Sequence, residues 1–271
     1  MIQLDKHAGV GFIWLARPQK HNAFDGDMLE AIDATVAEWQ DDPGVRVIVL
    51  GSEGPSFCAG ADLAWMSAQA QLGPDANRAN AQKLGGVFHR IAASKKPVVA
   101  RVHGAARGGG VGLVAACDIA VASEDASFAL TEVRLGLVPG VISPFVVERI
   151  GPSQARALFM TGDTVSAQDA FRLGLVHHLV PADELTPRVT AVVRSLILGG
   201  PDALAVCKRL AAEVAFRKPA EVFDYTVAAI AAARASDEAA EGMAAFLQRR
   251  PPAWVPGVAP VTGLVADKPA D

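Results

Sequence analysis

Apolar positions alternate with polar ones at two different spacings in the first 130 residues. Residues 2–15 form two alternating runs around a short polar turn, which predicts a β-hairpin. Residues 45–50 and 97–102 are short runs rich in β-branched residues, as is typical of buried strands. Helices are predicted over residues 25–41, from about residue 62 onward, and over residues 75–93. We therefore expect parallel β–α–β units in this part of the chain.

From Pro144 onward the pattern is mainly helical. Helices are predicted over residues 144–150, 155–160 and 167–173, a strand over residues 174–180, and further helices after Pro181 that end with residues 239–247. We expect residues 1–195 to form the core with the functional site. Residues 196–271 are expected to form a helical region that acts in oligomerisation or as a lid, and its proline-rich end from residue 251 is expected to be loose.

A glycine-rich segment at residues 103–112 connects the strand at 97–102 to a small apolar helix. Three consecutive glycines, Gly108 to Gly110, are costly in chain entropy, and they make sense where backbone N–H groups must approach a ligand closely. Close packing of the helix against the strand is the structural alternative. Glu132 follows twenty residues after Gly112 in otherwise apolar surroundings. A turn rich in N–H donors and one carboxylate together predict an active site.

Composition narrows the class of protein. Of the 271 residues, 51% are hydrophobic and 20% are charged, which is typical of a globular protein with a large core. The net charge is −4 with scattered basic residues, so we expect no nucleic-acid partner. Three cysteines favour a reducing compartment without disulfides, and no signal-peptide pattern or long apolar run is present. We expect a cytoplasmic protein that does not enter a membrane.

Three separated motifs, at residues 57–63, at 103–113 with 117–119, and at 131–139, resemble the crotonase family of acyl-CoA enzymes. The last predicted helix is similar to that of the family as well. This resemblance covers nearly the whole chain and implies an α/β fold, a spiral of β–β–α units with a helical C-terminal region. It also implies assembly into homotrimers or dimers of trimers. Within the family, residues 57–66 and 142–147 resemble the methylglutaconyl-CoA hydratases of leucine degradation.

The resemblance implies particular roles for residues of the motifs. The backbone N–H groups of Ala61 and Gly109 are expected to hold the thioester carbonyl and to stabilise an enolate-like oxyanion. Hydratases of the family commonly use two glutamates, which map here to Glu132 and to Gly112, a residue with no side chain. Further acyl-CoA contacts are expected from Ala59, Gly60, Asp62, Leu63, Trp65, Arg107, Gly108, Arg134, Pro139 and Phe246.

A single carboxylate leaves more than one function open. It can act as base and then acid in the syn-hydration of a 2-enoyl-CoA of fatty acid metabolism, or in the reverse dehydration of a 3-hydroxyacyl-CoA. It can equally shuttle a proton between carbons, as in a Δ3,Δ2-enoyl-CoA isomerase. A third alternative is an acyl-CoA-binding member without catalytic activity, although a buried carboxylate argues against it. We expect a hydratase, a lyase that needs no metal and no cofactor other than the CoA of its substrate.

Some of these residues also have purely structural interpretations. Glu132 could pair with Arg134 or stand as an acid at a helix N-terminus. Arg107 and Arg134 could pair on the surface instead of binding a substrate carboxylate, which a methylglutaconyl group would require. Trp65 could belong to the core or line an acyl pocket. Cys58 is expected to be a small buried apolar residue, because no histidine accompanies it as a base.

Overall fold

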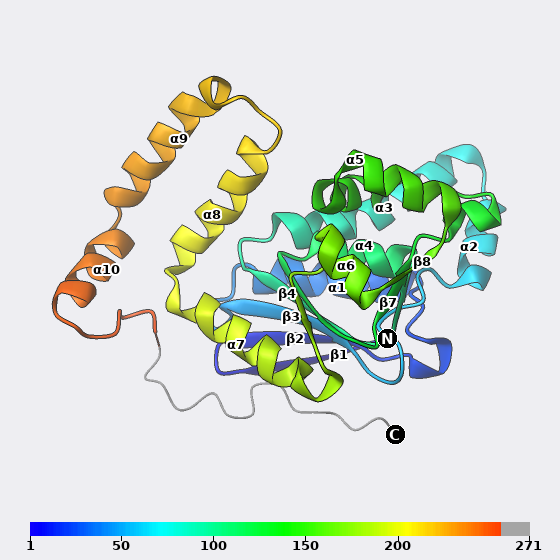
Figure 1. The fold of residues 1–271 in the computed structure, drawn as a ribbon, viewed down its shortest axis with the longest axis horizontal. Helices are drawn as coiled ribbons and strands as arrows, with labels where there is room; N and C mark the ends of the chain where they lie inside the picture. Colours follow the sequence, from blue (N-terminus) through cyan, green and yellow to red (C-terminus); the bar gives the residue numbers. More distant parts are fainter. Residues whose placement is uncertain (256–271) are drawn as a thin grey trace.

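A six-stranded sheet forms the centre of the computed structural model, which describes residues 1–255 (Figure 1). Its spatial order is β1-β2-β3-β4-β6-β9. The strands are β1 (Ile2–His7), β2 (Val10–Leu15), β3 (Val47–Ser52), β4 (Val98–Val102), β6 (Ile119–Ser123) and β9 (His178–Val180). The first two strands pair antiparallel, as the predicted hairpin, and every other neighbouring pair is parallel. The expected parallel β–α–β organisation is confirmed.

Helices cover both faces of this sheet, so its central strands β2, β3, β4 and β6 are buried on both sides, whereas the edge strand β1 is mostly exposed. On one face, Ile48 and Leu50 of β3 belong to a large core with α1 (Gly26–Trp39), α3 (Pro74–Ala93) and α4 (Gly109–Ala116). On the other face, the alternate residues of the same strands pack against α7 (Leu185–Leu198). This arrangement explains why the central strands are continuous apolar runs in the sequence.

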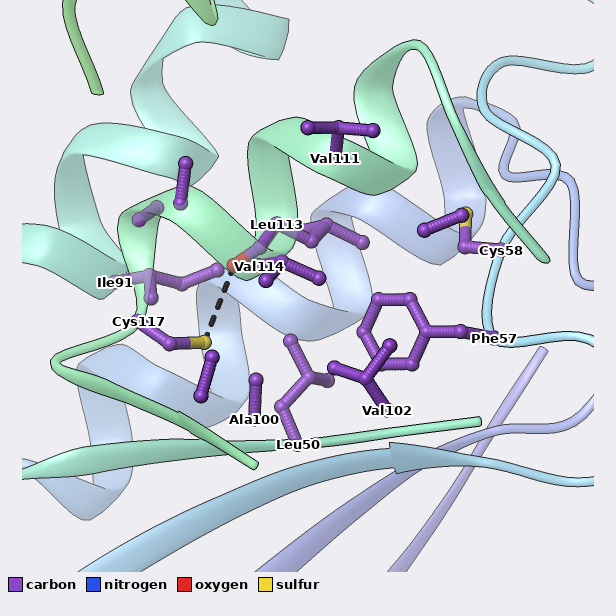
Figure 2. Close-up of a cluster of buried hydrophobic side chains, with 14 of the residues drawn as sticks. Leu50, Phe57, Cys58, Ile91, Ala100, Val102, Val111, Leu113, Val114 and Cys117 are labelled. Carbon is purple, nitrogen blue, oxygen red and sulfur yellow. Dashed lines mark hydrogen bonds between the residues drawn. The ribbon is translucent and has the colours of Figure 1, made fainter. Parts of the chain in front are cut away.

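The small apolar helix α4 lies against the central strands, as predicted. Its residues from Gly110 to Ala116 are all buried. Figure 2 shows Leu113 and Val114 of α4 among side chains of β3 and β4, with the Cys117 thiol donating a hydrogen bond of 3.1 Å to the Leu113 carbonyl. Small side chains allow this helix to approach the sheet closely.

A second sheet of three short strands was not predicted in full. It contains β5 (Ala105–Arg107), β7 (Ser127–Ala129) and β8 (Thr164–Ser166), in the order β5-β7-β8. Part of the expected glycine-rich turn is therefore a strand, β5, whose parallel pairing with β7 sets Arg107 opposite Ala129. This pairing brings the glycines that follow β5 next to the segment that contains Glu132.

The remaining elements near the core include the helix predicted from about residue 62 and the helices predicted after Pro144, with one difference among the latter. They are α2 (Leu63–Ala70), α5 (Ser143–Thr161), α6 (Ala167–Leu173) and the short 3-10 helices η1 (Pro18–Lys20), η2 (Glu132–Leu135) and η3 (Ala182–Glu184). The two helices expected at residues 144–150 and 155–160 form the single element α5, which is kinked where Gly151 adopts φ of 73° before Pro152.

Three C-terminal helices, α8 (Pro201–Val214), α9 (Pro219–Arg234) and α10 (Asp237–Leu247), extend away from the rest of the protein as an arm (Figure 1). The chain turns by 106° between α7 and α8. Arg46 donates hydrogen bonds to the Gly199 and Trp254 carbonyls and so ties both ends of the arm to the core. The predicted loose tail lies largely in residues 256–271, outside the described residues.

No single helix within residues 1–255 is long and apolar enough to span a membrane. One strongly bent pair, residues 182–198 with α8, has sufficient length and apolar composition only when its two helices are counted together.

Candidate active site

Two turns that precede helices lie side by side at the edge of the core. The Cys58 amide donates to the Ala105 carbonyl at 3.0 Å, and the Arg107 amide donates to the Cys58 carbonyl at 2.8 Å. On its other side, the same segment pairs with Phe24, whose amide donates to the Gly60 carbonyl at 2.8 Å. These bonds hold the turn before α2 against β5 and against the turn before α4.

The N–H groups of Ala61 and Gly109 are left free by this arrangement. Ala61 pairs with Phe24 in a parallel β-bridge. The two hydrogen bonds of this bridge are made by the Gly60 carbonyl and the Asp62 amide, so the N–H of Ala61 itself points away from Phe24. Gly109 is the first residue of α4, where backbone N–H groups have no acceptor within the helix. Within residues 1–255 neither N–H donates a hydrogen bond. Both are therefore available to a ligand.

The turn before α4 needs glycine at residues 108–110, because neighbouring atoms leave no room for side chains at Gly109 and Gly110 and because Gly108 has a backbone conformation that favours glycine. Gly108 has φ of +48°, which L side chains rarely adopt, and a Cβ atom there would lie 3.0 Å from Glu132 Oε1. A Cβ atom on Gly109 would lie 2.4 Å from the Phe24 ring, and one on Gly110 would lie 2.4 Å from the Cys58 carbonyl oxygen. The glycines thus serve both the exposed N–H group and the close packing that was the structural alternative.

Glu132 lies at the beginning of η2 with its carboxyl group half-buried. Its Oε2 atom is buried and has no hydrogen-bond partner within the described residues. Burial raises the pKa of the Glu132 carboxyl above its ordinary value. The alternative of an ion pair with Arg134 is wrong, because Arg134 instead pairs with Asp163 at 3.1 Å on the surface.

The two free N–H groups and Glu132 share one cavity of about 130 Å³. Eight of the residues expected at the site line it: Ala59, Gly60, Ala61, Leu63, Gly108, Gly109, Glu132 and Pro139. The other lining residues are Phe24, Met66, Leu84, Phe88, Thr131, Leu135, Leu137, Val138, Gly140, Val141 and Ile142. Among all these described residues, Glu132 is the sole titratable one. The cavity is an apolar pocket with one acid and two N–H donors.

Gly112 does not line this pocket, and no side chain fits at its position. A Cβ atom on Gly112 would lie 2.3 Å from Ile142 Cγ2 and 3.1 Å from the Phe88 ring. Ile142 itself is buried and forms part of the pocket wall. The volume into which a second glutamate would project is therefore filled by Ile142 and Phe88.

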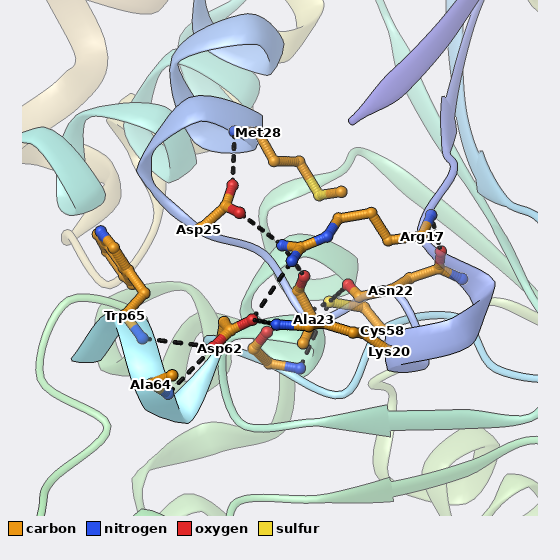
Figure 3. A network of polar contacts seen from close by, with 11 residues as sticks. Arg17, Lys20, Asn22, Ala23, Asp25, Met28, Cys58, Asp62, Ala64 and Trp65 are labelled. Carbon is orange, nitrogen blue, oxygen red and sulfur yellow. Dashed lines mark hydrogen bonds and ion pairs between the residues drawn. The ribbon is translucent and has the colours of Figure 1, made fainter. Parts of the chain in front are cut away.

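Asp62 contributes to the site by holding the Ala61 turn. Its carboxylate caps α2 by accepting from the Ala64 and Trp65 amides at 3.0 and 3.3 Å, and it accepts from Lys20 Nζ at 2.6 Å (Figure 3). The hydrogen bond from Lys20 is the main cause that lowers the pKa of Asp62 to about 2. Asp62 lies outside the lining of the pocket and acts on it through the backbone.

Trp65, Arg107 and Phe246 also lie away from this candidate pocket. Trp65 lines a separate cavity between α1 and α3. The Arg107 guanidinium donates to the Ser127 carbonyl at 2.7 Å and to its hydroxyl at 3.0 Å. Phe246 is 83% exposed on the arm. Neither Arg107 nor Arg134, which pairs with Asp163, is thus placed to meet a substrate inside this pocket.

Several lining residues were not predicted, and some of them carry a signal in the sequence. Phe24 is an apolar residue at the end of a polar loop, and it proves to be buried between the two turns. Phe88 and Leu84 lie on the apolar face of α3, where they look like ordinary core positions. Cys58 is buried, which confirms the prediction of a small buried residue, and burial raises the pKa of its thiol to about 12.

Comparison with known proteins shows the family of this chain. Residues 5–256 match the family model described as enoyl-CoA hydratase/isomerase, and the chain belongs to this family, the crotonases. The crotonyl-CoA hydratase of Syntrophomonas wolfei is 35% identical over 92% of this chain and 95% of that protein. The short-chain-enoyl-CoA hydratase of Clostridium acetobutylicum is 32% identical over 76% of this chain and 78% of that protein.

Solved structures show the same fold. An enoyl-CoA hydratase from Shewanella pealeana is similar with a TM-score of 0.90 and 34% identity, covering 93% of this chain and 95% of that one. Pseudomonas aeruginosa AtuE is similar with a TM-score of 0.89 and 36% identity, covering 94% of this chain and 99% of that one. The expected crotonase fold and enzyme class are thereby confirmed.

Proposed function

We propose that this enzyme adds water across the double bond of a 2-enoyl-CoA thioester, and catalyses the reverse dehydration, with Glu132 as its single acid–base residue. The observation that carries the proposal is the buried Oε2 atom of Glu132, which has no partner within the described residues and lines the same small pocket as the free N–H groups of Ala61 and Gly109. An acid with an unpaired oxygen in the same pocket as two unpaired donors suits a reaction that moves a proton while negative charge develops nearby.

The proposed reaction uses these groups in sequence. Glu132 takes a proton from a water molecule while the oxygen of that water bonds to C3 of the substrate. The electrons of the double bond move onto the thioester oxygen, where the Ala61 and Gly109 N–H groups stabilise the negative charge. Glu132 then returns a proton to C2 on the same face, so that one water molecule is added and the carboxylate is restored. Each donor of this kind typically contributes about 3 kcal/mol of transition-state stabilisation.

The raised pKa of Glu132 supports this double role. A carboxylate with an ordinary pKa is a weak base near neutral pH, whereas one raised by burial binds a proton more readily and still releases it to carbon.

The pocket favours a short and uncharged acyl group. Its volume of about 130 Å³ is close to that of an engineered cavity of about 150 Å³ that binds benzene, so it suits roughly four to six carbons. None of the described lining residues is a cation, and a methylglutaconyl carboxylate buried there without a partner would be costly. We therefore propose crotonyl-CoA as a better substrate than 3-methylglutaconyl-CoA. The printed name of the Syntrophomonas wolfei relative, crotonyl-CoA hydratase, supports this choice.

An enoyl-CoA isomerase is the second candidate, because one acid suffices for moving a proton between two carbons. Ile142 fills the volume next to Gly112, which leaves Glu132 as the sole acid among the described lining residues. In this reaction Glu132 would remove a proton from C2 of a 3-enoyl-CoA and return it to C4, with the same two N–H groups holding the enolate.

Three substrates distinguish these functions. The enzyme is incubated separately with crotonyl-CoA, 3-methylglutaconyl-CoA and 3-hexenoyl-CoA, and both ultraviolet absorbance of the conjugated thioester and proton NMR are followed. We expect crotonyl-CoA to lose absorbance as 3-hydroxybutyryl-CoA appears, faster than the glutaconyl thioester reacts. Movement of the double bond in 3-hexenoyl-CoA, without hydration of crotonyl-CoA, would identify an isomerase. Binding without conversion of any substrate would indicate a member without catalytic activity.

We propose further that the arm of α8, α9 and α10 mediates assembly into trimers or dimers of trimers. Its exposed large apolar side chains include Phe216, Phe223, Ile230, Met243, Phe246 and Leu247. Light scattering after size-exclusion chromatography should give three or six times the chain mass, and Phe223→Glu should lower it. A lid over the site would instead leave a monomer. The cytoplasmic location and the absence of a cofactor requirement stay predictions.

A further inference from the structure

A second cavity lies next to the catalytic pocket, between α1, α2 and α3. Its volume is about 410 Å³, roughly three times that of the catalytic pocket. It is lined by Gly26, Asp27, Leu29, Glu30, Asp33, Trp65, Asn80, Lys83, Leu84, Gly86, Val87 and Arg90. Of the described residues that line either cavity, Leu84 is the one that lines both. The proposed reaction makes no use of this space.

The partition between the two cavities is thin. Leu84 lies on α3, half-buried, and packs against the main core. The adjacent residues of α2 face different cavities, since Met66 lines the catalytic pocket and Trp65 lines the second one. The side chain of Leu84 is therefore the element that both cavities share.

The interior of the second cavity is suited to a hydrocarbon chain. Leu29, Val87 and Trp65 are apolar residues of its lining, as is Leu84. Charged groups lie among the lining as well, and two of them, Arg90 and Asp33, are already paired with each other. An uncharged alkyl chain can cover the apolar surface without separating that pair.

We propose that Leu84 limits the length of the acyl chain by closing the catalytic pocket off from this second cavity. The inference rests on the proposed function only in that an acyl-CoA must bind with its acyl group in the catalytic pocket. A chain of four carbons ends before Leu84, whereas a chain of eight would meet it. Shortening Leu84 joins the two cavities, and each methylene that then becomes buried strengthens binding by up to about fourfold.

The test measures binding of saturated acyl-CoAs, so that it does not depend on turnover. Butyryl-CoA and octanoyl-CoA are titrated calorimetrically into the wild-type protein and into Leu84→Ala, with Leu84→Val as a milder variant should the alanine protein fail to fold. We expect the affinity ratio of octanoyl-CoA to butyryl-CoA to rise tenfold or more in Leu84→Ala, and by a smaller factor in Leu84→Val.

Two further variants control for pocket size and for the path of the chain. Leu137→Ala enlarges the catalytic pocket by the same number of atoms but does not line the second cavity, so it should leave the ratio within about twofold of wild type. A Cβ atom on Gly86 meets no other atom within 4 Å, so Gly86→Leu in the Leu84→Ala protein should fill the second cavity and reverse the gain.

Each outcome is decisive. A ratio that is equal in wild type, Leu84→Ala and Leu137→Ala would overturn the role of Leu84 while leaving the proposed function intact, provided that butyryl-CoA binds. An equal rise in Leu84→Ala and Leu137→Ala would also overturn it, because enlargement alone would then explain the change. Absence of binding of either thioester to the wild-type protein would overturn the proposed function itself.

Discussion

The replacement of Gly112 by alanine tests whether the part of the pocket wall formed by Ile142 is as tightly packed as the structure indicates. Gly112 is a helical residue of α4, and alanine in place of glycine ordinarily stabilises a helix by about 1 kcal/mol. Here the added Cβ atom would lie 2.3 Å from Ile142 Cγ2 and 2.8 Å from Ile142 Cβ. Contacts this short require Ile142 or the helix to move.

The expected effect is therefore a loss of stability where helix propensity alone predicts a gain. Overpacking of a core typically costs about 1 to 3 kcal/mol, and a contact as short as 2.3 Å places this site at the upper end of that range. After the helix contribution of about 1 kcal/mol is subtracted, a net loss of about 2 kcal/mol remains. With an unfolding entropy of about 2.1 cal/mol/K per residue, this corresponds to a Tm lower by about 3 to 4 °C.

Thermal unfolding followed by circular dichroism measures this change, and Gly86→Ala is the matched control. Gly86 lies within α3, and a Cβ atom there meets no other atom within 4 Å, so this variant should be as stable as wild type or more stable. In a double-mutant cycle, Ile142→Ala should remove most of the cost of Gly112→Ala. A Gly112→Ala protein as stable as Gly86→Ala would refute the packing argument.

Further predictions concern Glu132 and Asp62. Because burial raises the pKa of Glu132, kcat/KM should begin to fall with decreasing pH above the ordinary glutamate value of about 4.3, and a profile that is flat down to that value would contradict the assigned base. The raised pKa also means that Glu132→Gln should be more stable than wild type at pH 8, with the difference disappearing below about pH 4. Asp62→Ala removes the cap of α2 and the partner of Lys20, so kcat/KM should fall by about 10- to 100-fold as the Ala61 N–H shifts, whereas Asp62→Asn, which retains a capping oxygen, should lose less. Since the pKa of Asp62 is lowered to about 2, its contribution to stability should be complete above about pH 4 and be lost as the pH falls toward 2, as acid titration of the unfolding midpoint would show.

The sequence predicts the chemistry of the site better than its shape. Consecutive glycines before a buried helix, and one acid in apolar surroundings, are local features with a local physical cause, and Gly109 and Glu132 indeed share one pocket. The N-cap at Asp62 and the buried helix α4 follow from the same kind of local rule. The burial of the central parallel strands on both faces agrees with their continuous apolar runs.

Other features depend on contacts between distant segments, which no local pattern records. Ile142 fills the volume beside Gly112 because α5 begins there against α4, although the two residues are thirty positions apart. Strand β5 is three residues long and is defined by its pairing with β7. Which cavity Trp65 faces depends on how α2 is rotated against α1 and α3, and this follows from tertiary packing.

In the proposed mechanism, Glu132 alone supplies and receives the proton during hydration. This role is tested by comparing wild type with Glu132→Gln for conversion of crotonyl-CoA in D₂O, followed by NMR. We expect wild type to yield 3-hydroxybutyryl-CoA with one deuterium at C2, and we expect Glu132→Gln, while binding butyryl-CoA normally, to be slower by about 100- to 10,000-fold. Hydration at an unchanged rate in Glu132→Gln would contradict this role, because another group would then have to move the proton.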